Sequence, residues 1–455
     1  MGSIMGSLLA ASRSLQMFQR GMEVVQNNVA NANTPGYAKQ TLQLVADRFM
    51  PDLGIAGGVS SPGNLDSRSD FAERAVRRQL ENYGAAEQNA TQFAQLEPVF
   101  TVSEGLGVPN ALSQLFQAFS GLTVTPNDPS ARQVALTRAS ALAQSFQSTS
   151  RDLQNAQQLA DGDLKSTVDQ INSIGGQLRE LNAQFRSDFR RQNDAGMNAQ
   201  LYDLLGQLSQ LTDANVMRQD DGSVTVYVGG QSLLLIGDTV HPLQLDPSGT
   251  SAVLRDDQGN DVSTEIQGGK LSSLMKFRNE TLPGYSISLD RLAQSVADSF
   301  NSTLAAGVDL NGQSPASPLF TYDQTKGAAG TLAVTSISPD QLALATPDAP
   351  GGNGNALALT QLETAKNIDN FTFQQFYGNI AADVGRAVEA ANASASTQQQ
   401  LVTQAQTWRD QISKVDLNEE AARLVQYQTS YQAAARMITA LDEMTQTLIN
   451  MFPAA

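Results

Sequence analysis

The N-terminal part of the chain reads IMGSLLAASRSLQMFQRGMEVVQNNVANANTPGY over residues 4–37. Its apolar side chains recur at alternating intervals of four and three residues, which keeps them on one face of an α-helix for about four heptads. We call this face the N-terminal seam. It includes Leu8, Leu15, Phe18, Met22 and Val25. The spacing predicts a long helix that packs against another helix.

The C-terminal part of the chain repeats this pattern, with Thr445 as its one polar break. This C-terminal seam includes Leu424, Tyr431, Ile438, Leu441 and Leu448. Two helices at opposite ends of a chain, each with one narrow apolar face, can bury these faces against each other. We therefore predict a terminal coiled-coil domain formed by residues 1–35 and 416–455.

The flanks of the N-terminal seam are mainly Ser, Gln and Asn, and Glu23 is the only acidic residue before Asp47. An exposed surface helix usually carries Glu and Lys in these places. Small uncharged side chains cost less to bury against a neighbouring chain. The composition favours burial between copies of the protein, and the alternative is an amphipathic helix packed within its own domain.

The first helix is predicted to end between Asn31 and Asn33. Pro35 disfavours the helical conformation at Thr34, and a Pro-Gly pair suits the central positions of a type II turn. A change of chain direction at Gly36 and a plain helix stop are both compatible with these residues.

The middle of the chain changes from helical to strand periodicity and back. Apolar spacing predicts helices at 71–97, 108–122, 129–189, 198–213, 271–304, 356–367, and from 373 to the end with a break at 415–418. Period-two patterns predict strands at 224–228 and 232–236, and shorter ones near 240–245, 251–255 and 262–266. Residues 307–355 are rich in Gly, Pro, Asp and Ser and are predicted to be mainly loop.

These patterns predict a mainly α fold with an inserted β-rich domain, of the α+β class. The molecule is expected to be elongated, with its N- and C-terminal helices paired as a coiled coil. A helical middle domain would comprise residues 36–215 and 270–415. The β-rich outer domain would comprise 216–269, and part of 307–355 is a candidate to join it.

The composition excludes several classes of function. The 455-residue chain has a net charge of −16, and such an acidic surface repels phosphate backbones, so we expect no nucleic-acid binding. The absence of Cys excludes disulfides and thiolate sites. The single histidine, His241, leaves no two-histidine zinc motif and is interpreted as a strand-end residue.

The remaining patterns favour a structural protein. No apolar run reaches the ~18–20 residues that span a bilayer, and the N-terminus lacks the pattern of a cleaved signal peptide, so we expect no membrane insertion. No motif indicates a catalytic, metal or cofactor site. We therefore expect no enzyme and no cofactor, and a carboxylate pair in the β-rich part is the remaining enzymatic alternative.

The sequence NNVANANTPGYAKQ at residues 27–40 resembles the N-terminal signature of the bacterial flagellar rod, hook and hook-associated axial proteins. The turn residues that carry the resemblance are Asn28, Asn31, Asn33, Thr34, Pro35, Gly36 and Tyr37. The Thr-Pro-Gly-Tyr form is similar to that of hook-associated members, whereas rod and hook proteins usually have Thr-x-Gly-Phe. Lys39 stands where the family usually has Arg.

Four other stretches are also similar to this family. They are VDLNEEAARLVQYQTSYQAAARMI with LDEMTQTLIN at 415–438 and 441–450, and more loosely DGSVTVYVGGQSLL at 221–234 and GGKLSSLMKFRN at 268–279. The middle of the chain is short for the family, which implies that an additional outer domain is absent.

The resemblance implies a structural protein of the hook–filament junction in the extracellular flagellum. It would be exported by the flagellar type III apparatus without a cleaved signal peptide, and would form a homo-oligomeric, ring-like layer at the distal end of the hook. The implied partners are the hook protein, hook-associated protein 3 and a flagellar export chaperone. The terminal helices would line the inner tube, with the β-rich domain outermost. The alternative is another axial protein, from the distal rod or the hook.

Overall fold

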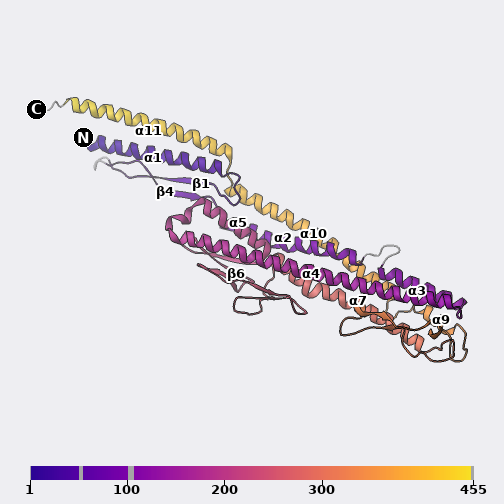
Figure 1. Ribbon diagram of the computed structural model, residues 1–455. Coiled ribbons are helices and arrows are strands. Elements are labelled where there is room, and N and C mark those ends of the chain that lie inside the picture. Colours follow the sequence, from indigo (N-terminus) through magenta and orange to yellow (C-terminus); the bar gives the residue numbers. More distant parts are fainter. Residues whose placement is uncertain (1, 51–54, 101–106, 452–455) are drawn as a thin grey trace.

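A computed structural model describes residues 2–50, 55–100 and 107–451. The molecule is elongated, and both termini lie at one end (Figure 1). Helix α1 (Gly2–Ala30) runs antiparallel to α11 (Leu417–Met451), beside the hairpin of β1 (Gln40–Ala46) and β4 (Val59–Asp66) (Figure 1). The predicted elongated, mainly α fold with paired terminal helices is confirmed.

Long helices build the rest of the molecule. They are α2 (Asp70–Leu96), α3 (Gly107–Val124), α4 (Pro129–Ser187), α5 (Ala195–Leu211), α7 (Leu282–Ala305) and α10 (Phe373–Ser413). Shorter helical elements are η2 (Glu97–Phe100), η3 (Phe189–Asn193), α6 (Gly269–Lys276), η4 (Phe277–Thr281), α8 (Ala328–Thr331), η5 (Pro339–Gln341) and α9 (Gly354–Gln361). The predicted helix at 356–367 thus ends earlier, at Gln361.

Capping residues explain where these helices begin. The carboxylate of Asp128 accepts a hydrogen bond from Ser130 N, and Pro129 occupies the first turn of α4 as the sequence predicts. Thr372 and Gln375 form a reciprocal capping box at the start of α10. Helix α4 then continues without a break for 59 residues.

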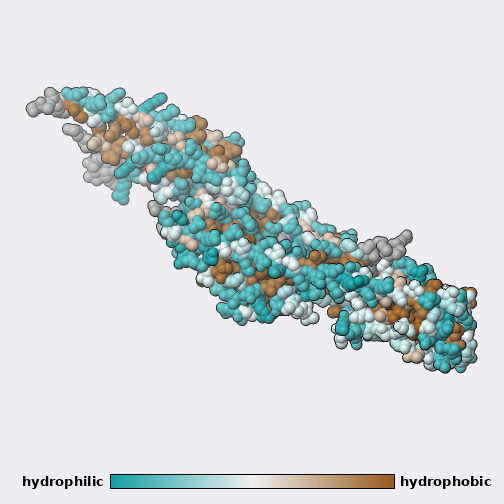
Figure 2. Space-filling model, viewed as in Figure 1, coloured by the Kyte–Doolittle hydropathy of each residue, from teal (hydrophilic) through white to brown (hydrophobic). Residues whose placement is uncertain are grey.

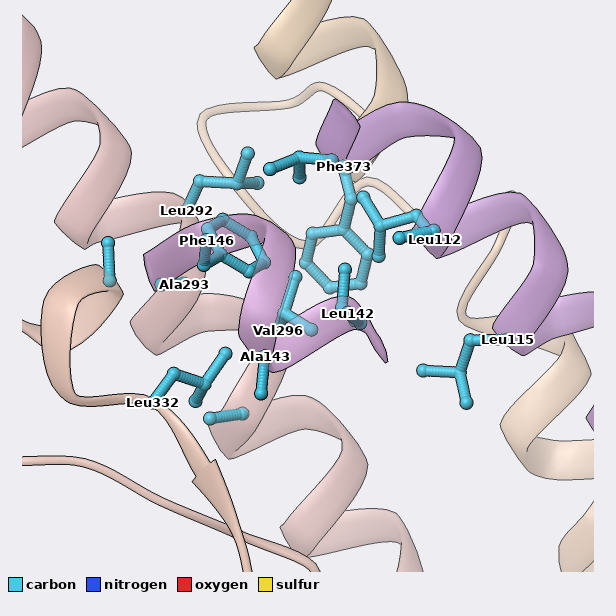
Figure 3. Close-up of a cluster of buried hydrophobic side chains, with 14 of the residues drawn as sticks. Leu112, Leu115, Leu142, Ala143, Phe146, Leu292, Ala293, Val296, Leu332 and Phe373 are labelled. Carbon is cyan, nitrogen blue, oxygen red and sulfur yellow. The ribbon is translucent and has the colours of Figure 1, made fainter. Parts of the chain in front are cut away.

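One hydrophobic core occupies the end of the molecule opposite the termini. Phe146 and Leu142 of α4, Val296 of α7, Leu112 of α3 and Phe373 of α10 converge there (Figure 3). Residues 307–355 contribute five buried side chains to this core, namely Leu319, Phe320, Leu332, Leu342 and Leu344. Strands β11 (Phe320–Thr321) and β12 (Ala333–Val334) pair within it. These residues therefore pack with the helices and not with the β-rich part, although the sequence left part of 307–355 as a candidate for the β-rich domain.

The second core joins the β-rich part to the second half of α4. An antiparallel meander is formed by β5 (Ala214–Arg218), β6 (Val224–Val228), β7 (Ser232–Ile236) and β8 (Thr239–Val240), followed by the hairpin of β9 (Gln244–Asp246) and β10 (Val253–Arg255). Val224, Val226 and Leu234 are buried in this core. The prediction of a strand at 262–266 is wrong. Val262 and Ile266 are buried in this core, but they lie in a segment without regular secondary structure.

The hairpin between α1 and α2 was not foreseen. Residues 40–66 were assigned to the helical middle domain, whereas β1 and β4 pack against α1 (Figure 1). Leu42 is the one buried leucine of β1, and most of the hairpin is exposed. Its sequence therefore has no long alternation of apolar and polar residues that would have predicted the strands. The domain division proposed from the sequence remains a prediction, with this hairpin beside the terminal helices. Small strands β2 (Phe49–Met50) and β3 (Ile55–Ala56) extend the hairpin.

Candidate assembly site of the terminal helices

Both predicted seams face the interface between α1 and α11. Val25 is buried and Leu8, Leu15, Phe18 and Met22 are half-buried. On α11, all five named seam residues are half-buried, namely Leu424, Tyr431, Ile438, Leu441 and Leu448. Most of the positions between them are exposed, so burial along the two helices follows the heptad spacing.

Two close approaches set the antiparallel register. Gly21 of α1 lies against the ring of Tyr427, and Asn28 of α1 lies against Glu420. This register places Val25 level with Leu424. It places Phe18 level with Tyr431 and leaves Leu448 level with the very start of α1.

Asn28 uses its whole amide to join three elements. Its Nδ2 donates to Gln40 O at 2.8 Å and to Glu420 Oε2 at 3.1 Å. Its Oδ1 accepts from Gln40 N and from Tyr37 Oη, both at 2.9 Å. Asn28 and Glu420 are fully buried, so each of these bonds replaces lost hydration. The side chain therefore fixes α1, β1 and the first turn of α11 to one another.

An ion pair reinforces this contact at the protein surface. Lys39 Nζ lies 2.8 Å from Glu419 Oε2, and Arg423 donates to the other oxygen of Glu419 at 2.7 Å. The hydrogen bond from Lys39 holds the pKa of Glu419 below its ordinary value. This hydrogen bond requires only one N–H group, so lysine can form it at the position where the family usually has arginine.

The Thr-Pro-Gly-Tyr segment forms the predicted turn. Tyr37 N donates to Thr34 O at 3.1 Å, and Gly36 has a φ of +71°, which together give a type II turn. A Cβ at Gly36 would overlap the carbonyl oxygen of Ala199 in α5. The turn is thus docked on the middle of the molecule, which a plain helix stop would not require.

The other turn residues differ in their roles. Asn31 donates to Asn27 O at 3.0 Å and accepts from Thr34 Oγ1 at 3.1 Å, closing the end of α1. Asn33 and Pro35 are exposed. Burial raises the pKa of Tyr37 to about 12, and the carboxylates of Asp66 and Glu420 act in the same direction. Tyr37 is therefore a neutral hydrogen-bond donor at physiological pH.

Small side chains leave a groove of about 500 Å³ along the terminal helices. Ala10, Ala11 and Ser14 of α1 and Ala433 and Ala434 of α11 line it. Large apolar side chains point outward from the same two helices, and Figure 2 shows apolar surface over this end of the molecule. They are Met5, Leu9, Leu417, Val425, Met437, Met444, Ile449 and Met451, each more than half exposed. Sequence reasoning missed these exposed residues, although Met437, Met444 and Met451 recur at intervals of one heptad.

Other residues considered from the sequence form no comparable site. His241 follows β8, and its Nδ1 lies 2.7 Å from Asp257 Oδ2 on a half-exposed surface. Within residues 2–50, 55–100 and 107–451, no three His, Cys, Asp or Glu side chains are grouped to hold a metal ion. Of the helices described, none has the length and apolarity needed to cross a membrane.

Comparison with known protein families decides the identity. Residues 93–320 match the helical domain of flagellar hook-associated protein FlgK. Residues 8–37 match the flagella basal body rod proteins, and residues 410–451 match the C-terminal part of the rod proteins FlgE, FlgF and FlgG. The chain belongs to the FlgK family. FlgK is the hook–filament junction protein, a structural component of the flagellum.

Individual FlgK proteins are similar over nearly the whole chain. Flagellar hook-associated protein 1 of Bacillus subtilis is 27% identical, with 99% of each chain covered. The Salmonella typhimurium protein of that name is 23% identical, with 98% of this chain and 100% of that protein covered. The Salmonella alignment runs over 560 positions, so that FlgK carries segments that this 455-residue chain lacks.

A solved FlgK structure supports the fold. The flagellar hook junction protein FlgK from Burkholderia pseudomallei matches with a TM-score of 0.66 at 17% identity. The match covers 74% of this chain and 99% of that one. The FlgK relatives are structural flagellar proteins, and the match to the FlgK helical domain favours a hook-associated protein over the distal rod or hook alternative.

Proposed function

We propose that this chain assembles as a ring-like layer at the distal end of the hook and allows the filament to be attached. The observation that carries the proposal is the apolar surface of the terminal helices. Eight large apolar side chains are exposed on the pair formed by α1 and α11, beside a groove of small residues. Exposed apolar faces on a two-helix unit are stabilised when neighbouring chains cover them.

Charge is distributed as lateral packing requires. Residues 1–66 and 414–455 carry seven basic and nine acidic side chains, so this part contributes −2 to the net charge of −16. The remaining −14 lies in the rest of the chain. Copies of the terminal part can therefore approach one another with little repulsion.

The terminal part gains order when copies pack. Most seam positions are only half-buried in the single chain, and an isolated pair of helices is weakly stable in water. Assembly would bury the groove and the outward-facing methionines and so complete the folding of this part. Coupled folding of this kind suits a subunit exported through the flagellar type III apparatus without a cleaved signal peptide.

The partners follow from the proposed position in the axial structure. The layer would contact the hook protein on one side and hook-associated protein 3 on the other. An export chaperone would bind α11 before assembly, because this helix exposes apolar residues such as Val425 and Met437 in the single chain.

The test is deletion of the gene followed by electron microscopy of the cells. Hooks that persist without filaments, with flagellin released into the medium, are the expected result, and the intact gene supplied in trans should restore filaments. Loss of the hook itself would instead indicate a distal rod or hook protein. Normal filaments on the deletion strain would refute the proposed function.

A further inference from the structure

A small cavity of about 180 Å³ lies in the middle of the molecule, between the start of α2, helix α5 and the edge strand β5. Its polar lining consists of Asp70, Arg74, Arg77, Tyr202 and Arg218. Apolar side chains of α5 and the sheet, including Leu201 and Val224, form its floor. We call this cavity the arginine pocket.

The arginine pocket holds three guanidinium groups and one carboxylate. Asp70 Oδ1 accepts a hydrogen bond from Tyr202 Oη at 3.0 Å. Arg218 donates to Asn198 Oδ1 at 2.7 Å and to Tyr202 Oη at 3.3 Å, and neither acceptor is charged. Arg74 Nε donates to the carbonyl oxygen of Asp70 at 3.2 Å. The hydrogen bonds made here by Arg74 and Arg218 go to uncharged acceptors, and among the residues that the structure describes neither guanidinium forms an ion pair.

Arg77 is the most isolated of the three. In the part of the chain that the structure describes, no carboxylate oxygen lies within 4 Å of its guanidinium group. Burial lowers the pKa of Arg77, and Tyr202, Glu73 and Asp70 oppose this effect. A guanidinium that has lost hydration without gaining a carboxylate is poorly compensated.

Neighbouring residues hold the pocket in shape. The guanidinium of Arg68 stacks 4.0 Å from the ring centre of Tyr202, and that of Arg218 lies 5.9 Å from it. Arg68 is itself paired with Glu73 at 2.6 Å, so its charge is used within the chain. A preorganised set of planar donors is the arrangement that binds a carboxylate through two parallel hydrogen bonds.

We propose that the arginine pocket receives an aspartate or glutamate side chain from a neighbouring copy of this chain. Charge complementarity identifies this occupant, because the chain carries 45 acidic residues against 29 basic ones and every neighbouring copy offers carboxylates. The exposed Arg74 marks the side from which the carboxylate enters. The inference rests on the proposed assembly into a layer.

Carbodiimide cross-linking of Arg77→Lys tests the proposal. The variant keeps the positive charge and supplies an amine, which the reagent joins directly to a carboxylate with loss of water. Junctions are purified from cells that produce the full-length variant, and the cross-linked peptides are identified by mass spectrometry. We expect a chain-to-chain link from position 77 in assembled junctions and its loss in dilute monomer. Arg151→Lys, at an exposed position of α4, is the control and should give no such link.

The outcomes separate this inference from the proposed function. Filaments on the Arg77→Lys strain, with links from position 77 only to Asp70 or Glu73 of the same chain or with no link at all, would overturn the pocket's role and leave the junction function intact. Arg77→Glu provides a second test, with at least a tenfold loss of filament-bearing hooks expected. A variant that melts like the parent chain and bears normal filaments would also overturn the inference.

Discussion

Gly21 of α1 lies directly against the aromatic ring of Tyr427 of α11. A Cβ at Gly21 would approach two ring carbons of Tyr427 to 2.7 Å, closer than van der Waals contact allows. The absence of a side chain at Gly21 therefore lets the ring rest on the backbone of α1. This contact holds the two ends of the chain together in the last third of α1 and the first third of α11.

The effect of Gly21→Ala should depend on Tyr427. In the parent chain, the new methyl group displaces the ring, and we expect the overpacking to outweigh the gain in helix propensity, with a net loss of about 1 kcal/mol in the pairing of α1 with α11. In a Tyr427→Ala background the clash is gone, so the same substitution should stabilise α1 by about 1 kcal/mol. Hydrogen exchange of the α1 amides measures both values.

Gly162→Ala is the matched control for this experiment. Gly162 lies in helix α4, and a Cβ there would meet nothing within 4 Å. We expect a stabilisation of about 1 kcal/mol whichever residue occupies position 427. If Gly21→Ala stabilises the parent chain to the same degree, the position of the Tyr427 ring does not depend on the absence of a side chain at Gly21.

Asn28→Ala should loosen the joint between the terminal helices and the hairpin. The substitution removes the hydrogen bonds that Asn28 makes with the backbone of Gln40 and with the carboxylate of Glu420. Tyr37 Oη keeps only its hydrogen bond to Asn27 Oδ1 at 3.2 Å. Buried unsatisfied groups cost about 1–3 kcal/mol each, and partial rehydration should bring the net loss to about 3 kcal/mol. Exchange of the Gln40 amide reports it directly. Asn33→Ala, in the exposed part of the same turn, should change the stability by less than about 0.5 kcal/mol.

The periodic features were predictable from the sequence, and the contacts between distant polar residues were not. Heptad spacing places Leu15 and Ile438 on the apolar faces of their helices, and Asp128 with Pro129 indicates the start of α4. Both signals are contained in short stretches of sequence. Asn28 and Glu420 are 392 residues apart, and neither belongs to an apolar pattern. The arginine pocket likewise combines α2, α5 and β5, so its composition is visible only after the chain has folded.

The pairing of Lys39 with Glu419 should make the terminal part sensitive to acid. The pKa of Glu419 is lowered in the folded chain from its ordinary value of 4.5, so the pairing stabilises the fold above about pH 4.5 and is lost as the pH falls through the lower folded value. Lys39→Met and Glu419→Gln should therefore flatten the decline in stability below pH 4.5. Because Glu419 is 42% exposed, high salt should weaken the effect. An unchanged acid profile in both variants would show that the pair contributes nothing.

Glu81 should show the opposite dependence on pH. Burial raises its pKa, and the neighbouring carboxylate of Asp213 raises it further. The folded chain therefore loses stability as the pH rises from the ordinary value of 4.5 through the raised value, where Glu81 becomes charged. Glu81→Gln should stabilise the chain at neutral pH and reduce this loss, as measured by thermal unfolding between pH 4 and 7. A variant that is less stable at pH 7 would mean that the charged carboxylate is favourable where it lies.

Leu15→Asp and Ile438→Asp should abolish filament attachment without unfolding the middle of the molecule. Each places a carboxylate in a half-buried seam, where its desolvation opposes the pairing of α1 with α11 and the packing of copies. The two hydrophobic cores lie outside these helices, so the main thermal transition and most of the helical circular dichroism should persist. Ile287→Asp is the control, because Ile287 is 66% exposed on α7 and leaves both seams intact. Electron microscopy should then show bare hooks for the two seam variants and filaments for the control. Normal filaments from both seam variants would mean that assembly does not depend on the paired termini.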